Sequence, residues 1–159
     1  MRGRTLMIGL FVVTAIFALA LWWFQTRAYY EQSGGVDAIE VAGLSIPVEG
    51  YSQIDAQTSP LKLRACFRLS DPADLPRAAA AAAPLTEEAR AAGVTLEPLV
   101  APGWFDCFDA ETLAGLAQSD GAETLVAARN APQGVDRVVL LLPDGRGWLW
   151  RQLNETYQE

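Results

Sequence analysis

The feature that most constrains this chain is an uninterrupted apolar run near its N-terminus, Leu6–Phe24. The run holds no charged residue, and Thr14 carries its only hydroxyl group. As a helix that rises about 1.5 Å per residue it would be about 28 Å long, which matches the hydrocarbon layer of a bilayer. Trp22 and Trp23 stand at its far end, where aromatic rings favour the headgroup region. The run therefore predicts one transmembrane anchor that begins at Leu6 and ends at Phe24.

The charges that flank this run predict its orientation. Arg2 and Arg4 precede it, and Arg27 is the only basic residue that follows it closely. Positive charges are retained on the cytoplasmic side, so residues 1–5 are expected in the cytoplasm and the chain from residue 30 onward across the membrane. The predicted location is the inner (plasma) membrane of a Gram-negative cell, single-pass, with a periplasmic C-terminal domain.

A cleaved signal peptide is the alternative to this anchor. Ala18–Ala20 resembles the small-residue pattern of a signal-peptidase site. A cleaved signal turns polar beyond that site, however, whereas this run stays apolar as far as Phe24. An uncleaved signal anchor is therefore the favoured interpretation.

Charge limits the partners of the part that follows the anchor. All 19 acidic residues lie beyond the apolar run, whereas three of the 12 basic residues flank it. The whole chain carries a formal net charge of −7, and the part beyond the anchor is still more negative. A field of this sign disfavours nucleic acid as a partner. No glycine-rich phosphate-binding motif is present, so no nucleotide is expected either.

The chain contains no histidine, which excludes several chemistries. Nucleophile–histidine pairs, histidine-ligated zinc or copper, and a phosphate-accepting histidine all require that side chain. Both methionines, Met1 and Met7, lie at the N-terminus, so a methionine-lined copper site in the domain is excluded as well. We expect no cofactor, no metal site and no catalytic residues, and the protein is predicted not to be an enzyme.

The rest of the chain predicts one small domain of the α+β class. A juxtamembrane linker is expected at residues 25–37, with a flexible exit at 31–36, and the domain at 38–159. A Pro/Ala-rich insertion at about 70–102 is expected to hold a loose helical turn near 78–83 and a short helix over 85–92.

The sheet of this domain is predicted from alternation and turn signals. One main helix is expected to pack on it at about 110–119, and residues 51–59 are expected to be a polar connection. The predicted sheet is antiparallel, with five or six strands: Ala38–Val41, Leu44–Val48, Leu61–Leu69, Glu123–Ala128, Arg137–Leu142 and Gly147–Leu153.

The clearest strand pattern, Leu61–Leu69, presents an unusual cationic row. Its apolar residues alternate with Lys62, Arg64, Cys66 and Arg68, which would share the other face. One interpretation is a solvated strand face whose cations pair with carboxylates on a neighbouring strand. The other is a docking stripe for an acidic partner or an anion, which makes the three cations candidate partner-binding residues.

Cys66 and Cys107 are the only cysteines, and they allow three interpretations. In an oxidising compartment a small even number of cysteines indicates a structural disulfide, which is the favoured one. Two unpaired thiols are possible as well. A redox or metal-relay pair is the third, because the cations beside Cys66 would lower the pKa of its thiol.

Two further groups of residues are candidate sites. Asp106, Asp109 and Glu111 could form an acidic cation site, but a carboxylate cluster at the start of a helix is the favoured interpretation. Trp148 and Trp150 share one face of the last strand. They are expected to pack on the sheet, with a partner-binding or ligand-stacking platform as the alternative.

Several segments together resemble one family. The chain is similar to small, single-pass, membrane-anchored alphaproteobacterial proteins of unknown function in its segments MRGRTLMIGLFVVTAIFALALWWFQTRAYYEQ, SPLKLRACFR, PLVAPGWFDCFDAETL and DGRGWLWRQLNE. Members of that family are sometimes labelled histidine kinases. The label does not fit this chain, which lacks histidine, a nucleotide-binding glycine pattern and sufficient length. The resemblance implies an architecture and brings no catalytic residues.

The function expected from these observations is that of a non-enzymatic accessory or assembly factor. Its periplasmic domain would bind another envelope protein. The alternative is a thiol-based redox or metal-handling factor that uses Cys66 and Cys107.

Overall fold

The computed structural model describes the chain except for residues 1, 83–84, 86, 88–90, 92 and 158–159. It divides into two compact units, Met1–Tyr30 and Glu31–Glu159. The short helix expected over 85–92 falls largely on residues outside the described ones. The other expected elements can be compared with the structure directly.

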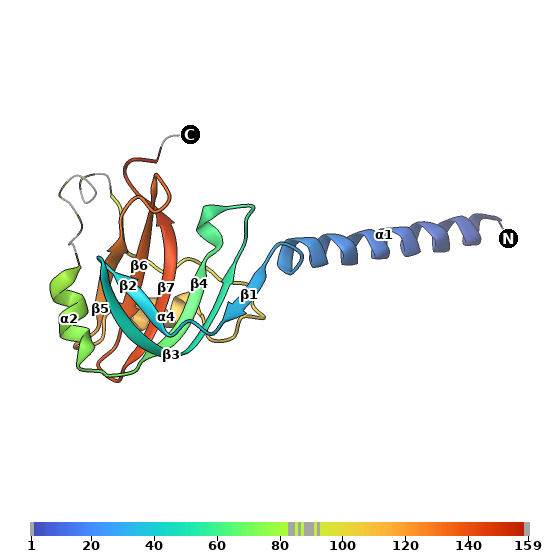
Figure 1. The fold of residues 1–159 in the computed structure, drawn as a ribbon. Coiled ribbons are helices and arrows are strands. Elements are labelled where there is room, and N and C mark those ends of the chain that lie inside the picture. The colour runs from blue at the N-terminus through green and yellow to red at the C-terminus, as the bar shows by residue number, and fades with distance from the viewer. Residues whose placement is uncertain (1, 83–84, 86, 88–90, 92, 158–159) are drawn as a thin grey trace. The chain divides into compact units, whose positions relative to one another are not determined.

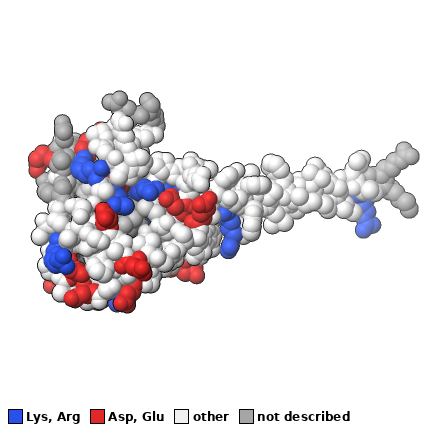
Figure 2. Space-filling model, viewed as in Figure 1, with Lys and Arg blue, Asp and Glu red and all other residues white. Residues whose placement is uncertain are grey.

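The first unit is a single long helix, α1 (Arg2–Thr26). Within its stretch Gly3–Thr26, an 18-residue window has a mean hydropathy of 2.4 and no buried residue, so the helix is long and apolar enough to cross a membrane. Figure 2 shows its surface as almost entirely uncharged, with basic side chains near its two ends. An N-terminal candidate membrane helix is therefore present, as the apolar run predicts.

The second unit is built on an antiparallel sheet, so the predicted α+β class is confirmed (Figure 1). The described residues form seven strands in the order β1-β3-β4-β7-β6-β5, with β2 paired to β3. The strands are β1 (Glu31–Gly34), β2 (Ala38–Val41), β3 (Leu44–Asp55), β4 (Arg64–Leu69), β5 (Glu123–Ala128), β6 (Val135–Leu141) and β7 (Arg146–Leu153). The strand count is thus slightly higher than expected.

The additional strand pairing comes from two segments that were expected to be irregular. β1 occupies the expected flexible exit, and β3 extends through half of the expected polar connection. The polar side chains there do not prevent pairing, because Ser33 lies opposite Gln53 and Gly34 opposite Ser52 at the edge of the sheet. β1 and β2 pair with the two halves of β3, which has an irregularity between Glu49 and Ser52.

The helices differ from expectation mainly in extent. The loose turn predicted near 78–83 is a regular helix that begins earlier, α2 (Asp74–Ala81), and a 3-10 turn, η1 (Pro60–Lys62), precedes β4. The main helix, α4 (Ala110–Leu116), begins where predicted because the Asp109 side chain accepts a hydrogen bond from the backbone N–H of Thr112.

One face of the sheet encloses the main apolar core. The sheet curls so that β2 reaches β5, where the backbone N–H of Ala42 donates to the carbonyl of Ala127 over 2.7 Å. α2 contacts β3 and β5. The buried core residues are Ile39, Val41, Ile46, Val48, Leu63, Ala65, Phe67, Leu69, Ala78, Ala127, Val139, Leu141 and Leu149. The strand expected over Leu61–Leu69 begins only at Arg64, because η1 occupies its first residues. Of the predicted inward face, Leu63, Ala65, Phe67 and Leu69 are buried, whereas Leu61 is half-buried.

Candidate functional site

The opposite face of the sheet is covered by a long irregular stretch, residues 94–109, which we call the crossing segment. It runs over β4 and β7 without regular secondary structure before α4 begins. Four side chains of those two strands attach it to the sheet: Arg64, Cys66, Trp148 and Gln152. The centre of the cationic strand face predicted from sequence is therefore covered by this segment.

Arg64 fixes the middle of the crossing segment. Its Nε donates to the carbonyl of Leu99 over 2.9 Å, and its Nη2 donates to the carbonyl of Val100 over 3.3 Å. Its Nη1 donates to the carbonyls of Leu61 and Leu63, each over 2.6 Å. Arg64 is only 5 % exposed, and four carbonyl oxygens accept hydrogen bonds from this buried cation.

The disulfide fixes the end of the crossing segment. Cys66 of β4 is bonded to Cys107, 41 residues later in the chain, so the structural disulfide interpretation is confirmed. The indole N–H of Trp148, directly opposite Cys66 in the register of β4 and β7, donates to the carbonyl of Cys107 over 2.9 Å. One covalent bond and one hydrogen bond therefore hold the same loop.

Aromatic packing completes the attachment. Phe108 lies edge-on to Trp150, with ring centroids 6.4 Å apart, and the guanidinium of Arg64 lies 5.8 Å from the Phe108 ring. Trp150 is fully buried and its indole N–H donates to Gln152, whose amide N–H₂ in turn donates to the carbonyl of Thr95. The two tryptophans therefore pack beneath the crossing segment and are not an exposed platform.

The outer side of the crossing segment remains accessible. Val100 is 82 % exposed, and Leu99 beside it is also exposed. Among the residues that the structure describes, the backbone of 94–101 forms no hydrogen bond with other backbone groups. This stretch is therefore an extended chain held by side chains, with main-chain groups that are not used in a ladder.

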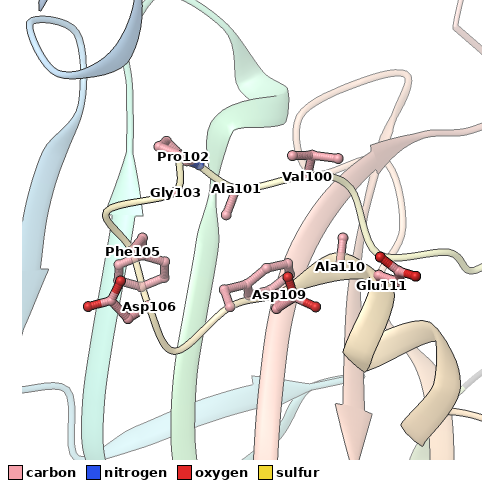
Figure 3. A pocket seen from close by; sticks show the side chains of 10 residues that line it. Val100, Ala101, Pro102, Gly103, Phe105, Asp106, Asp109, Ala110 and Glu111 are labelled. Atoms are coloured by element: carbon pink, nitrogen blue, oxygen red, sulfur yellow. The ribbon is translucent and has the colours of Figure 1, made fainter.

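Two hollows flank this exposed stretch. The larger, of about 450 Å³, lies between the limb that runs from Val100 to Gly103 and the limb that returns through Phe105 to α4 (Figure 3). The second, of about 330 Å³, is lined mostly by apolar side chains: Leu61, Val94, Leu99 and Leu153 together with Thr95, Glu97 and Gln152. Apolar contact surface therefore lies on both sides of Leu99 and Val100.

Three carboxylates border the larger hollow, those of Asp106, Asp109 and Glu111 (Figure 3). Hydrogen bonds from Thr112, first from its side chain and then from its backbone N–H, lower the pKa of Asp109 below its ordinary value of 3.8. Asp109 therefore acts as the cap of α4, as the favoured interpretation expected. Within the described part of the chain, no three His, Cys, Asp or Glu side chains gather in a way that could hold a metal ion.

The structure separates the predicted partner-binding residues into two groups. Arg64, Trp148 and Trp150 are buried, at 5 %, 8 % and 0 % exposed, so Arg64 is not an exposed member of the cationic row, and the two tryptophans pack on the sheet as the favoured interpretation expected. Lys62 and Arg68 stay at the surface, where Lys62 donates to Thr58 and Arg68 to the carbonyl of Asp144. The stripe is interrupted because the crossing segment covers its centre.

The anchor residues Leu6, Trp22, Trp23 and Phe24 are all exposed on α1. Val100 and Leu99, in contrast, were not expected to be site residues, because they lie in the Pro/Ala-rich insertion. The one available signal was local: Leu96–Ala101 is an apolar stretch interrupted by Glu97 and Pro98, which is typical of an extended segment at a surface.

Comparison with the curated proteins and with the solved structures finds no match. Residues 36–159 match the model of a family of unknown function, DUF6446. The matched part includes the whole crossing segment and every described strand except β1. The family of unknown function that the sequence resemblance implies is consistent with this match. The chain belongs to the family of unknown function DUF6446.

Proposed function

We propose that this protein is a single-pass inner-membrane protein whose periplasmic domain binds another envelope protein through the crossing segment. In this role it is an accessory or assembly factor without catalysis of its own. The observation that carries the proposal is the stretch 94–101, which is extended, exposed at Leu99 and Val100, and free of backbone–backbone hydrogen bonds among the described residues.

Such a stretch is suited to strand addition by a partner. An extended peptide that lies beside it gains main-chain hydrogen bonds, and its side chains gain the two flanking hollows as specificity pockets. The attachment by Arg64, Gln152 and the disulfide supports the same role, because a segment that is held in place before binding loses less conformational entropy when the partner arrives.

The expected membrane side supports this location. Arg2 and Arg4 precede α1, which favours a cytoplasmic N-terminus. A disulfide between Cys66 and Cys107 fits the oxidising environment of the periplasm and not the reducing cytosol.

Site-specific photocrosslinking tests the proposal. A photoreactive amino acid at Val100 of the full chain, expressed at its native level, should give one crosslinked product of defined mass in membranes. The matched control position is Arg77 on α2, whose side chain is 61 % exposed. A product at Val100 and none at Arg77 supports the proposal, whereas no product at Val100, or the same product at both positions, contradicts it.

A thiol-based redox function is the second candidate, and the exposure of Cys107 favours it. The double variant Cys66→Ser/Cys107→Ser separates the two functions. The redox function predicts loss of activity in cells while the domain remains folded. The binding function predicts that activity and crosslinking at Val100 decrease only as far as folding does.

A further inference from the structure

A further, polar pocket lies on the core face of the sheet, and the proposed function does not use it. Its volume is about 220 Å³. Its polar wall is formed by Tyr51, Gln53, Asp55, Arg137 and Arg151, and its apolar wall includes Val36, Ile39, Leu63 and Leu149. All these residues belong to the strands of the second unit and their connections.

Two arginines face each other in this pocket. Arg137 of β6 and Arg151 of β7 are direct partners in the antiparallel register, so their side chains leave the same face of neighbouring strands. Like charges in that arrangement repel each other. Asp55 compensates one of them, because Nη1 of Arg151 donates to its Oδ2 over 3.1 Å.

The second arginine has no equivalent partner. In the described part of the chain, Arg137 forms no ion pair, and its one hydrogen bond is a 3.5 Å contact from Nη2 to the carbonyl of Glu40. The Nε atoms of Arg137 and Arg151 are both buried and have no acceptor among the described residues. Buried donors without acceptors cost free energy, so a native site of this kind calls for an acceptor that arrives from outside.

The other charged and polar groups of the pocket wall limit the charge of that acceptor. The Glu40 carboxylate also borders the pocket, so two carboxylates and two guanidinium groups leave the wall formally neutral, which disfavours a phosphate dianion. The guanidinium Nε–H groups without acceptors are the donors that a single carboxylate would use. Burial raises the pKa of Tyr51 above 10.0 against the opposing effect of the two guanidinium groups, so its hydroxyl stays protonated. That hydroxyl donates to Oε1 of Gln53 over 2.7 Å.

We infer that this pocket binds a carboxylate on a short aliphatic stem, with the carboxylate between Arg137 and Arg151 and the stem against Leu149. A guanidinium group presents paired donors that match the two oxygens of a carboxylate. The volume suits one such group and is below that of sites for larger ligands. The source is either a small free carboxylate or the C-terminus of a peptide, and both share this chemistry.

Arginine Nε–H NMR signals of the full chain in lipid nanodiscs test the inference. Butyrate, titrated at constant ionic strength, should shift the signals of Arg137 and Arg151 saturably and leave that of Arg146, the first residue of β7, unchanged. Butyramide should have no effect. A tripeptide with a free C-terminal carboxylate and its amidated form, run in parallel, identify the source. Absence of saturable shifts with both acids, equal shifts at Arg146, or equal binding of the amides would overturn the inference.

The variant Arg137→Gln adds a second test, with Arg146→Gln as the matched control. Without ligand, Arg137→Gln should keep or raise the thermal midpoint because it removes a like-charge neighbour of Arg151, and it should weaken binding of the acid by about tenfold or more. Arg146→Gln should leave binding unchanged. A lower midpoint in Arg137→Gln, or unchanged affinity, would contradict the inference.

Discussion

A single side chain, that of Arg64, links the sheet to the crossing segment. A buried guanidinium group needs acceptors, and here backbone carbonyls of Leu61, Leu63, Leu99 and Val100 provide them. Because two of these carbonyls belong to the crossing segment, the same hydrogen bonds that satisfy the cation also determine the path of the chain that covers it.

The variant Arg64→Met should therefore destabilise the domain by about 3 kcal/mol, since buried carbonyls lose their donors. It should also make the stretch around Val100 sensitive to limited proteolysis. Arg68→Met, at an exposed position of the same strand, is the matched control and should change stability by less than about 0.5 kcal/mol. Equal effects of the two variants in denaturant unfolding would contradict the assigned role.

Gly147 is required for a different reason, which is space. It lies opposite Phe67 in the register of β4 and β7, and a Cβ atom added there would overlap the Phe67 ring. That ring also stacks on Tyr51, with centroids 6.2 Å apart, so it has little freedom to move.

We predict that Gly147→Ala destabilises the domain by about 1–3 kcal/mol through overpacking. Gly115→Ala is the control, because an added Cβ in α4 meets nothing within 4 Å and should stabilise the helix by about 0.5–1 kcal/mol. Thermal unfolding of both variants measures the difference. A neutral Gly147→Ala variant would show that the ring can move away.

Residue-scale prediction from the sequence succeeded where the pattern was local. The period of two in Leu63–Leu69 indicates which side chains enter the core, because successive side chains of a strand point to opposite faces. It could not indicate that Arg64 is buried too. The segment that covers Arg64 lies more than 30 residues later, in a stretch without periodicity.

At the scale of elements, the disulfide is the strongest single constraint on the crossing segment. It closes a loop of 41 residues that includes α2 and the Pro/Ala-rich insertion. Closing such a loop restricts the unfolded chain and contributes about 4 kcal/mol by the chain-entropy relation.

The double variant Cys66→Ser/Cys107→Ser should therefore lose about 4 kcal/mol of unfolding free energy. In the wild-type protein, alkylation under denaturing conditions should label no cysteine before reduction and both cysteines after it. Labelling of both without a reductant would contradict the disulfide.

The start of α4 gives a prediction about pH. Hydrogen bonds from Thr112 lower the pKa of Asp109, so the ionised carboxylate is favoured in the folded state. Its stabilising effect is fully present above the ordinary pKa of 3.8 and is lost as the pH falls through the lower folded value.

Asp109→Asn should therefore unfold at a lower temperature than wild type at neutral pH, because it removes the charge that interacts with the helix terminus. The difference between the two midpoints should disappear as the pH falls below that lower folded value. Thermal unfolding of both proteins across this range is the measurement. A difference that is independent of pH would assign the effect to side-chain geometry.

Prediction of whole elements from the sequence was limited by tertiary pairing. The strands β2, β5, β6 and β7 and the start of α4 were expected near their observed positions, because turns and alternating residues mark them locally. β1 and the second half of β3 were not expected. Their polar sequences become strands only because each provides the other with an edge for pairing.

At the scale of the whole molecule, an apolar helix of membrane-spanning length is followed by one α+β unit, and only residues 27–30 connect α1 to β1. The class of both parts followed from the sequence. The candidate site did not, because the crossing segment lies over the centre of the predicted cationic row. The sequence analysis named three of the four residues that hold this segment, Arg64, Cys66 and Trp148. It missed Gln152 and the two residues that the segment exposes, Leu99 and Val100.

The central claim is that the exposed crossing segment binds another envelope protein. It is tested most directly by affinity purification of the tagged full-length chain from native membranes in mild detergent, with quantitative mass spectrometry. Wild type is compared with Val100→Asp, which places a charge on the proposed contact, and with Arg68→Asp as the surface control. We predict one stoichiometric partner with wild type and Arg68→Asp that is lost with Val100→Asp. Equal recovery with all three proteins, or a wild-type protein without a partner, would contradict the claim.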